Sequence, residues 1–331
     1  MTAAPFSRVA WIDLLRGIAV VGMIETHVVN TFLDTSFDST NWLRTLRSYD
    51  GLIAPCFLWI AGYVQGLSIR HGIAQDRSVI SAARLRRIGF IGLTGFALHA
   101  PIWNWLKGDF SKETWRILLN VDILQCLAVS LLLIIYLGHW ARKRFDLALT
   151  IALTAILCVS AMAANWHTGW MALDPWLNYD TGSLFPFFPV SGYALAGALF
   201  ARTKPSSKLL LPLSLGTLAL GLYFAPYPFQ LQHPAFFAER LGWVLLFVWL
   251  VWMTAKRVTL PWLQLAGRES LLMYVAHLVL IYAFPLGNAP LDRLIGHTLQ
   301  PRSAAFLFAT ILGLCFVLAW LNEKRKTRTT I

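Results

Sequence analysis

Hydrophobic and polar residues alternate along the chain in long blocks rather than in short amphipathic stripes. Ten apolar blocks recur, and most of them reach the roughly 17 to 25 residues that a helix needs to cross a bilayer. The blocks cover residues 11–33, 50–69, 84–104, 117–137, 146–164, 184–201, 209–225, 241–255, 269–286 and 303–321. We therefore predict an all-α fold, a polytopic membrane helical bundle of about ten transmembrane helices, forming a single integral-membrane domain over residues 1–331.

Two of these blocks differ from a regular span. The eighth, 241–255, is the shortest, and it reaches a spanning length if it extends back through Arg240. The sixth contains Pro186, Pro189 and Gly192, and such residues bend or break membrane helices. We expect the sixth helix to be the most strongly kinked.

The charge distribution gives this membrane protein an orientation. Hydrophobic residues make up 57% of the chain and charged residues 13%, whereas soluble domains carry about a quarter charged residues. Of the 28 Lys and Arg residues, 19 fall in connections on the side of the termini, 8 fall on the opposite side, and Arg16 lies within a block. Because cytoplasmic loops are enriched in Lys and Arg, both termini are predicted to be cytoplasmic. Basic residues scattered over short loops do not form a nucleic-acid footprint, so no nucleic-acid partner is expected.

The cysteines do not indicate a metal site. All four lie inside apolar blocks and none has the spacing of a CxxC motif, so small core residues are the simpler interpretation. The chain also lacks the short nucleotide-binding, nucleophile-elbow and zinc-protease motifs. We therefore expect neither a metal nor a soluble catalytic domain.

The first block carries an ionisable stripe, which is unusual for a segment that lies in lipid. His27 follows Arg16 by eleven residues, so the two side chains share a helix face about 16 Å apart, and Asp13 falls near the same stripe. Glu25 points to the opposite side. Ionisable groups at membrane depth are rare and usually face a bundle interior or a site. The alternative is a stabilising Asp13–Arg16 pair, with His27 capping the outer end of the helix.

Other blocks add polar groups that also need a protein interior. Asp50 begins the second block, Asp122 and Gln125 lie three residues apart in the fourth, and Tyr274 and His277 lie in the ninth. A paired interior carboxylate is an equal alternative for Asp122, and a satisfied interior histidine is the commoner role for a residue such as His277.

Several stretches resemble a known family. The start, RVAWIDLLRGIAVVGMIETH from Arg8, resembles the first helix of the transmembrane acyltransferase superfamily, and GRESLLMYVAH from Gly267 resembles a later motif of that superfamily. YDGLIAPCFLWIAG from Tyr49, VDILQCLAVS from Val121 and FPFFPVSGYALAGALF from Phe185 resemble the branch related to heparan-alpha-glucosaminide N-acetyltransferase. Lysosomal members carry Asn in place of His27 and a critical His in the next loop. Residues 34–49 contain no His, so the arrangement of the bacterial relatives fits better.

The resemblance implies a reaction. Enzymes of this kind move an acyl group, commonly acetyl, from cytoplasmic acyl-CoA to a hydroxyl or amine of a sugar, glycan or lipid-linked acceptor on the far side of the membrane. It implies a bacterial inner membrane protein whose partners are the lipid bilayer, acetyl-CoA or another acyl-CoA, and the acceptor, with a homodimer left open.

Roles for individual residues follow from the resemblance and the polar pattern. The catalytic set is His27, as general base or acyl carrier, with Arg16 and Asp13. The expected donor-binding residues are Arg84, Arg86, Arg87, Gln125, Tyr274 and His277. The expected acceptor-binding residues are Asp50, Asp122 and Trp166. Positive-inside charge alone would also explain the arginine cluster, and an interfacial aromatic belt would also explain Trp166.

Two other classes of protein remain open at this point. A secondary transporter or flippase would also place buried charges along a pathway, although such proteins usually show related halves and we find no repeat. A b-type haem protein needs facing axial histidines, for which His27, His99 and His277 are available.

Overall fold

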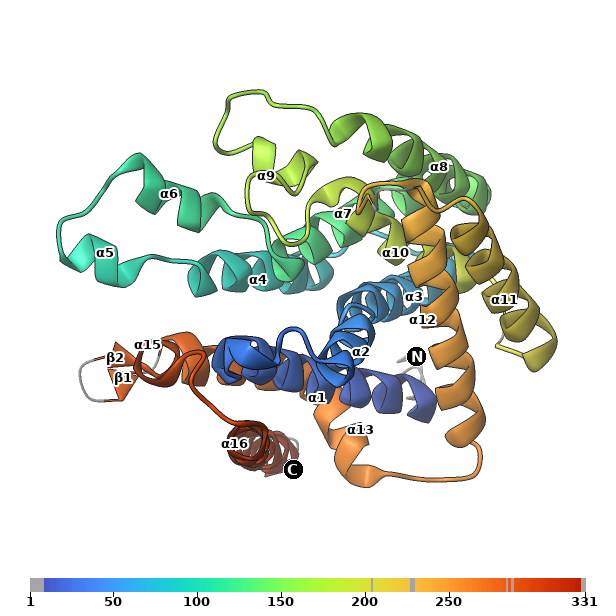
Figure 1. Cartoon of the computed structure of the whole chain (residues 1–331). Coiled ribbons are helices and arrows are strands. Elements are labelled where there is room, and N and C mark those ends of the chain that lie inside the picture. The colour runs from blue at the N-terminus through green and yellow to red at the C-terminus, as the bar shows by residue number, and fades with distance from the viewer. Residues whose placement is uncertain (1–8, 204, 227–229, 284, 287–288, 329–331) are drawn as a thin grey trace. The chain divides into compact units, whose positions relative to one another are not determined.

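The computed structural model describes residues 9–203, 205–226, 230–283, 285–286 and 289–328. This part of the chain is built of helices and one two-stranded hairpin (Figure 1). It divides into two compact units. The terminal unit combines Met1–Ala54 with Leu250–Ile331, and the central unit is Pro55–Trp249.

The terminal unit brings the two ends of the chain together. Its longest helices are α1 and α16, and a hairpin follows the π-helical turn η3. The elements are α1 (Ala10–Phe32), η1 (Thr35–Phe37), α2 (Asn41–Asp50), α13 (Pro261–Arg268), α14 (Ser270–Leu278), η3 (Val279–Ala283), β1 (Pro285–Leu286), β2 (Ala289–Pro290), α15 (Leu291–Ile295) and α16 (Pro301–Arg328). Asp50 therefore ends α2, and the prediction that it begins the second membrane helix is wrong, because Gly51 and Leu52 separate α2 from the next helix.

Helix α1 packs backbone to backbone against α13. A Cβ added to Gly17 would lie 1.9 Å from the Leu263 carbonyl oxygen, and one added to Gly267 would lie 1.8 Å from the Asp13 carbonyl oxygen. Glycines at such crossings let membrane helices approach until their backbones touch. The ionisable N-terminal half of α1 is therefore fixed against the short α13.

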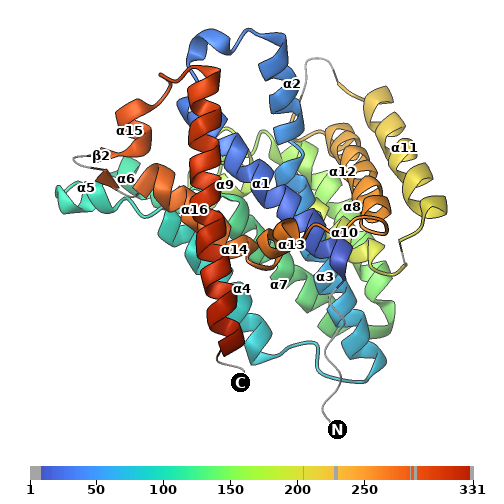
Figure 2. The ribbon, with the colours of Figure 1, turned by 90° about the horizontal axis from the view of Figure 1, so that it is seen from below.

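The ninth predicted span is not one straight helix. The backbone leaves helical geometry at Glu269, and the axis bends by 76° between α13 and the segment Ser270–Ala283. The buried Glu269 carboxylate at this break accepts hydrogen bonds from Lys326 Nζ at 2.5 Å and Asn322 Nδ2 at 2.8 Å. Both partners come from α16, which passes across α13 and α14 (Figure 2). This ionic contact gives partners to the Glu269 carboxylate, which would otherwise be buried unpaired.

The central unit is a helical bundle in which α7 contacts α4, α8 and α10. Its elements are α3 (Ile53–Ala74), which begins in the terminal unit, α4 (Ala82–Leu98), α5 (Ile102–Leu106), α6 (Lys112–Leu119), α7 (Ile123–Ala141), η2 (Arg142–Arg144), α8 (Phe145–Ala163), α9 (Asp174–Leu177), α10 (Phe187–Phe200), α11 (Ser207–Tyr223) and α12 (Pro234–Thr254), which ends in the terminal unit. Arg70 joins two of these helices, since it donates to Asp146 at 2.5 Å and to the Ala198 carbonyl at 2.7 Å.

The predicted irregularities are found in part. Helix α10 is kinked at Phe188, whose φ of −102° and ψ of 119° are not helical, as the proline pattern predicts. The apolar pattern does not predict the break at Glu269. The eighth block is longer than expected, because α12 begins at Pro234 and contains Arg240. Asp122 lies just outside the fourth helix rather than within it, as the N-cap residue of α7.

Some of the described helices are long enough to cross a membrane. Four helical segments are long and apolar enough to cross a bilayer, and the bent pair α13 and α14 would be a fifth if it counts as one span. The four are Asn41–Ala74, Ile123–Ala163, Pro234–Thr254 and Pro301–Arg328. The second of these contains the turn η2, where α7 ends and α8 begins. Ten spans with both termini cytoplasmic stay a prediction.

Candidate active site

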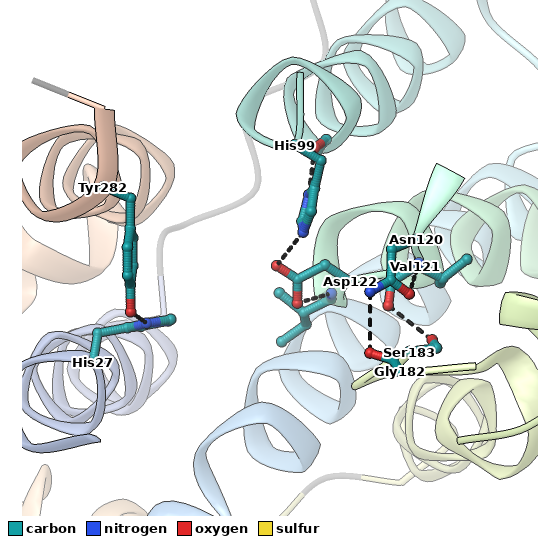
Figure 3. A network of polar contacts seen from close by, with 10 residues as sticks. His27, His99, Asn120, Val121, Asp122, Gly182, Ser183 and Tyr282 are labelled. Atoms are coloured by element: carbon teal, nitrogen blue, oxygen red, sulfur yellow. Dashed lines mark hydrogen bonds and ion pairs between the residues drawn. The ribbon is translucent and has the colours of Figure 1, made fainter. Parts of the chain in front are cut away.

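The terminal unit carries a histidine–tyrosine–threonine contact. The Tyr282 hydroxyl lies 3.1 Å from His27 Nδ1 (Figure 3). Thr31 stands one turn further along α1, and its Oγ1 lies 2.6 Å from the same hydroxyl. A residue and its i+4 neighbour share a helix face, so one hydroxyl reaches both. The contact holds the ring of His27 through its Nδ1 atom.

A second histidine lies against the first. His277 of α14 is fully buried, and its ring centroid lies 5.1 Å from that of His27. Its Nδ1 lies 3.0 Å from the Met273 carbonyl oxygen and must carry the proton there, because a carbonyl only accepts. The buried Nε2 is therefore an acceptor, and it has no hydrogen-bond partner among the described residues. An unsatisfied buried acceptor is unusual and points to a missing polar group.

The π-helical turn η3 explains why His277 and Tyr282 both reach His27. They are five residues apart, and in an α-helix this spacing places them about 140° apart. The π-helical turn at Val279–Ala283 inserts an extra residue, which rotates Tyr282 back towards the face of His277. π-Bulges of this kind occur frequently at functional sites.

A pair of carboxyl groups lies on the other side of α1. Glu25 is in hydrogen-bonding contact with Asp50 at the end of α2, and Thr26 also contacts Asp50. Asp50, expected to bind the acceptor, thus lies beside a second carboxyl group, with Arg47 adding a nearby positive charge.

Asp13 and Arg16 lie near the other end of α1. Fourteen and eleven residues separate them from His27, which corresponds to about 21 and 16 Å along the axis. Asp13 is therefore too distant to orient the His27 imidazole, and Tyr282 makes the contact that we expected from a carboxylate. Asp13 and Arg16 both make polar or electrostatic contacts of their own. Tyr274, expected to bind the donor, is buried with its ring edge against His277.

The central unit has a separate polar cluster around the start of α7. Asp122 accepts from the Ile123 backbone N–H at 2.7 Å, and its other oxygen lies 3.9 Å from His99 Nε2 (Figure 3). Gln125, one turn further, is 1% exposed, and neither atom of its amide has a partner among the described residues. An added Cβ on Gly95 would lie 2.7 Å from the Gln125 carbonyl oxygen, so only glycine leaves room for this amide.

The predicted arginine cluster lies at the start of α4. Arg84 donates to Ser68 Oγ at 2.7 Å and to the Val79 carbonyl, so its guanidinium is used within the protein. Arg86 and Arg87 are exposed. Of the three, these two are the ones available to a ligand. The described residues contain no group of three or more His, Cys, Asp or Glu side chains that could hold a metal ion.

The connection from α8 to α10 is organised around one carboxylate. The buried Asp174 accepts from the Thr168 hydroxyl at 2.6 Å, the Thr168 backbone N–H at 2.7 Å and the Gly169 backbone N–H at 3.1 Å. The hydroxyl donor and these backbone donors hold the pKa of Asp174 below its ordinary value of 3.8. Asn178 adds a bond from its amide to the Trp166 carbonyl at 2.6 Å, while the Trp166 ring is exposed.

We expect the loop around Asp174 to loosen in acid. Because folding lowers this pKa, the stabilisation is present above the ordinary carboxyl pKa and is lost as the pH falls below about 4. Hydrogen exchange should show the Thr168 and Gly169 amides protected at pH 6 and less protected at pH 3. Asp174→Asn should lose the protection at both pH values, whereas Asp180→Asn should keep it. Equal protection in the Asp174 variant would contradict this role.

Sequence reasoning missed Tyr282, Thr31 and the Glu25–Asp50 contact. Thr31 follows His27 by four residues and could have been found from helix spacing. Tyr282 could not, because the π-helical turn changes the period. Glu25 faces away from His27 as predicted, but its neighbour Asp50 ends a short helix, Asn41–Asp50, of which all but the last residue lies outside the predicted spans.

Comparison with protein families gives this site a chemical context. Residues 8–221, more than half of the chain, match the family described as heparan-alpha-glucosaminide N-acetyltransferase, catalytic. None of the curated proteins matches. The match includes His27 but ends before His277 and Tyr282. The chain, with its long apolar helices, therefore belongs to the heparan-alpha-glucosaminide N-acetyltransferase catalytic family of integral membrane acetyltransferases.

Proposed function

We propose that this protein transfers an acyl group, in the first place acetyl, from cytoplasmic acyl-CoA to an amine or hydroxyl of a saccharide outside the cytoplasm, with His27 as general base. The observation that carries the proposal is the contact of His27 on α1 with Tyr282 and His277. Family membership supports the acetyl-transfer reaction.

The Tyr282 contact suits a general base. If His27 Nδ1 donates to the Tyr282 oxygen, and the Tyr282 hydroxyl donates to Thr31, then Nε2 carries the lone pair that accepts the substrate proton. The acceptor nitrogen or oxygen then attacks the thioester carbonyl, the carbon–sulfur bond breaks, and the proton passes to the CoA thiolate. Positive charge that develops on the ring is stabilised through the Tyr282 oxygen.

Two buried polar groups without a hydrogen-bond partner, His277 Nε2 and the Gln125 amide, suit the binding of acyl-CoA. The pantetheine arm of CoA carries two amides, which need acceptors and donors in a dry environment. His277 Nε2 offers an acceptor, and the Gln125 amide offers both a donor and an acceptor. Arg16, Arg86 and Arg87 supply positive charge for the CoA phosphates, with Arg84 holding the start of their helix. Asp50, Asp122 and Trp166 stay assigned to the acceptor.

An assay on purified protein tests the proposed function. Protein in detergent or nanodiscs is incubated with acetyl-CoA labelled in the acetyl group and with glucosamine, and labelled sugar and free CoA thiol are measured together. Transfer predicts equal amounts of both products. Uptake of unmodified sugar into proteoliposomes without thiol release would contradict the proposal and favour a transporter.

We also propose the topology of ten spans with both termini in the cytoplasm, which the distribution of Lys and Arg supports. A phosphatase that is active only outside the cytoplasm should be inactive when fused after Ile331, and a green fluorescent reporter at the same place should fluoresce. The same phosphatase inserted within residues 164–183 should be active. The opposite pattern would place both termini outside the cytoplasm, and activity at both positions would require an odd number of spans.

A further inference from the structure

A groove of about 400 Å³ lies in the terminal unit, where α15 is followed by α16. Its apolar lining residues are Ile295, Leu299, Phe306 and Leu307. Two polar residues, Arg302 and Ser303, complete the lining. The volume lies within the range of small-molecule sites, about 300 to 1,000 Å³. A groove that combines an apolar surface with one cation suits a ligand that has an apolar part and a negative charge.

Arg302 is the charged residue of this groove. It is exposed, and within the described part of the chain it forms no ion pair. Asp34 and Asp292, the acidic residues of the neighbouring segments, are not among the lining residues. Ser303 adds a hydroxyl that can donate to an anion. The groove therefore carries a positive charge that its own lining does not balance.

The length of the apolar part of α16 indicates the depth of the groove in the membrane. Helix α16 is long and apolar enough to cross a bilayer, and residues 303–322 carry no charged side chain. At 1.5 Å per residue this segment covers about 30 Å, the thickness of the hydrocarbon core. Arg302 then lies at the level of the lipid headgroups, and Phe306 lies one turn deeper, among the acyl chains. The Phe306 side chain is 76% exposed, so this part of the groove is open to lipid.

The groove is also attached to the end of α1. The Leu299 backbone N–H donates to the Phe32 carbonyl at 2.8 Å, and the Asp34 backbone N–H donates to the Leu299 carbonyl at 3.0 Å. Leu299 packs against a buried cluster that contains Leu33 and Leu43. Figure 2 shows the start of α16 beside the segment that joins α1 to α2. The connection between α15 and α16 is therefore part of the wall of the groove and part of the packing that ends α1.

We propose that this groove binds one anionic phospholipid. Arg302 and Ser303 hold the headgroup phosphate through charge-assisted hydrogen bonds, and the apolar side chains contact the upper part of an acyl chain. The unbalanced charge of Arg302 favours a lipid with net negative charge over a zwitterionic lipid. Because Leu299 belongs both to the groove and to the packing at the end of α1, bound lipid also stabilises the connection between α15 and α16. This binding does not depend on the acyl-transfer reaction.

The test compares two lipids on the full-length protein. Protein in an uncharged detergent is titrated with phosphatidylglycerol or with phosphatidylcholine of the same acyl chains, and bound lipid is counted by native mass spectrometry. Arg302→Gln removes the charge, and Arg302→Lys keeps it. Arg293→Gln is the matched control, because Arg293 is also exposed, lies on α15 and does not line the groove. Hydrogen exchange of residues 296–300 shows whether the lipid binds at this place.

We expect the wild type and Arg293→Gln to bind phosphatidylglycerol about fivefold more tightly than phosphatidylcholine. Arg302→Gln should lose this preference, and Arg302→Lys should keep most of it. Phosphatidylglycerol should slow hydrogen exchange at residues 296–300 in the wild type but not in Arg302→Gln. Equal binding of the two lipids by the wild type, or an unchanged preference in Arg302→Gln, would overturn the proposal. Equal slowing of exchange by inorganic phosphate would also overturn it, because the site would then bind free anions rather than a lipid.

Discussion

Replacing His27 by alanine should lower acyl transfer by about 10²–10⁴-fold, which is the usual contribution of a general base. The imidazole is held by Tyr282 and lies against His277, whose buried Nε2 we assign to the acyl-CoA donor rather than to the acceptor. Binding of acyl-CoA should persist, because the donor contacts that we propose come from other residues. The rate is measured with the labelled transfer assay and donor binding with radiolabelled acyl-CoA.

Two further variants separate chemistry from folding. Tyr282→Phe keeps the aromatic ring beside His27 but removes the hydroxyl, so it should reduce the rate less than His27→Ala and shift the pH–rate profile. His297→Asn changes a histidine of the same unit outside the site. Asparagine tolerates its left-handed φ of 55°, and activity should be unchanged. Near wild-type transfer by a folded His27→Ala protein would exclude His27 as the base and make His277 the next candidate.

Replacing Gly267 by alanine should destabilise the terminal unit by about 3 kcal/mol, the upper end of the usual cost of overpacking. The new Cβ would lie 1.8 Å from the Asp13 carbonyl oxygen, and the obstacle is backbone, which cannot rotate away as a side chain can. Helices α1 and α13 would have to separate, which also displaces Glu269 and α14. We expect little monodisperse protein in detergent and a lower melting temperature.

Gly313→Ala is the matched control. Gly313 lies in α16 of the same unit, and an added Cβ there meets nothing within 4 Å. Alanine also has the higher helix propensity, so this variant should be as stable as the wild type or slightly more stable. Equal melting temperatures for the two variants would show that the α1–α13 crossing is looser than the structure describes.

Apolar length predicted where most helices lie, because the energy of placing a backbone in lipid depends on composition over a whole span. It did not predict the break at Glu269. A buried carboxylate there is stable only because Lys326 and Asn322 reach it from α16, about 55 residues later. Contacts between distant segments leave no periodic signal, and this is why the ninth block reads as an ordinary span.

In the candidate site, too, some residues can be predicted from the helical period and others depend on contacts between distant segments. The Arg16–His27 stripe follows from the regular 3.6-residue period, so a face could be assigned to His27 from the sequence. The placement of His277 beside His27 depends on how α14 packs against α1, and that of Tyr282 on one extra residue in η3. Gln125 was chosen as a polar residue in an apolar block, whereas the glycine that makes room for it lies on another helix.

The pairing of α1 with α13 also has a consequence for biosynthesis. The ribosome makes α1 first, but its partner begins only at Pro261. At about 5–20 residues per second, translation needs roughly 10 to 45 s to cover the intervening segment. During this interval the end of α1 that carries Asp13 and Gly17 lacks its native packing against α13. The nascent first helix must therefore be sheltered by the insertion machinery or by earlier contacts until the last quarter of the protein emerges.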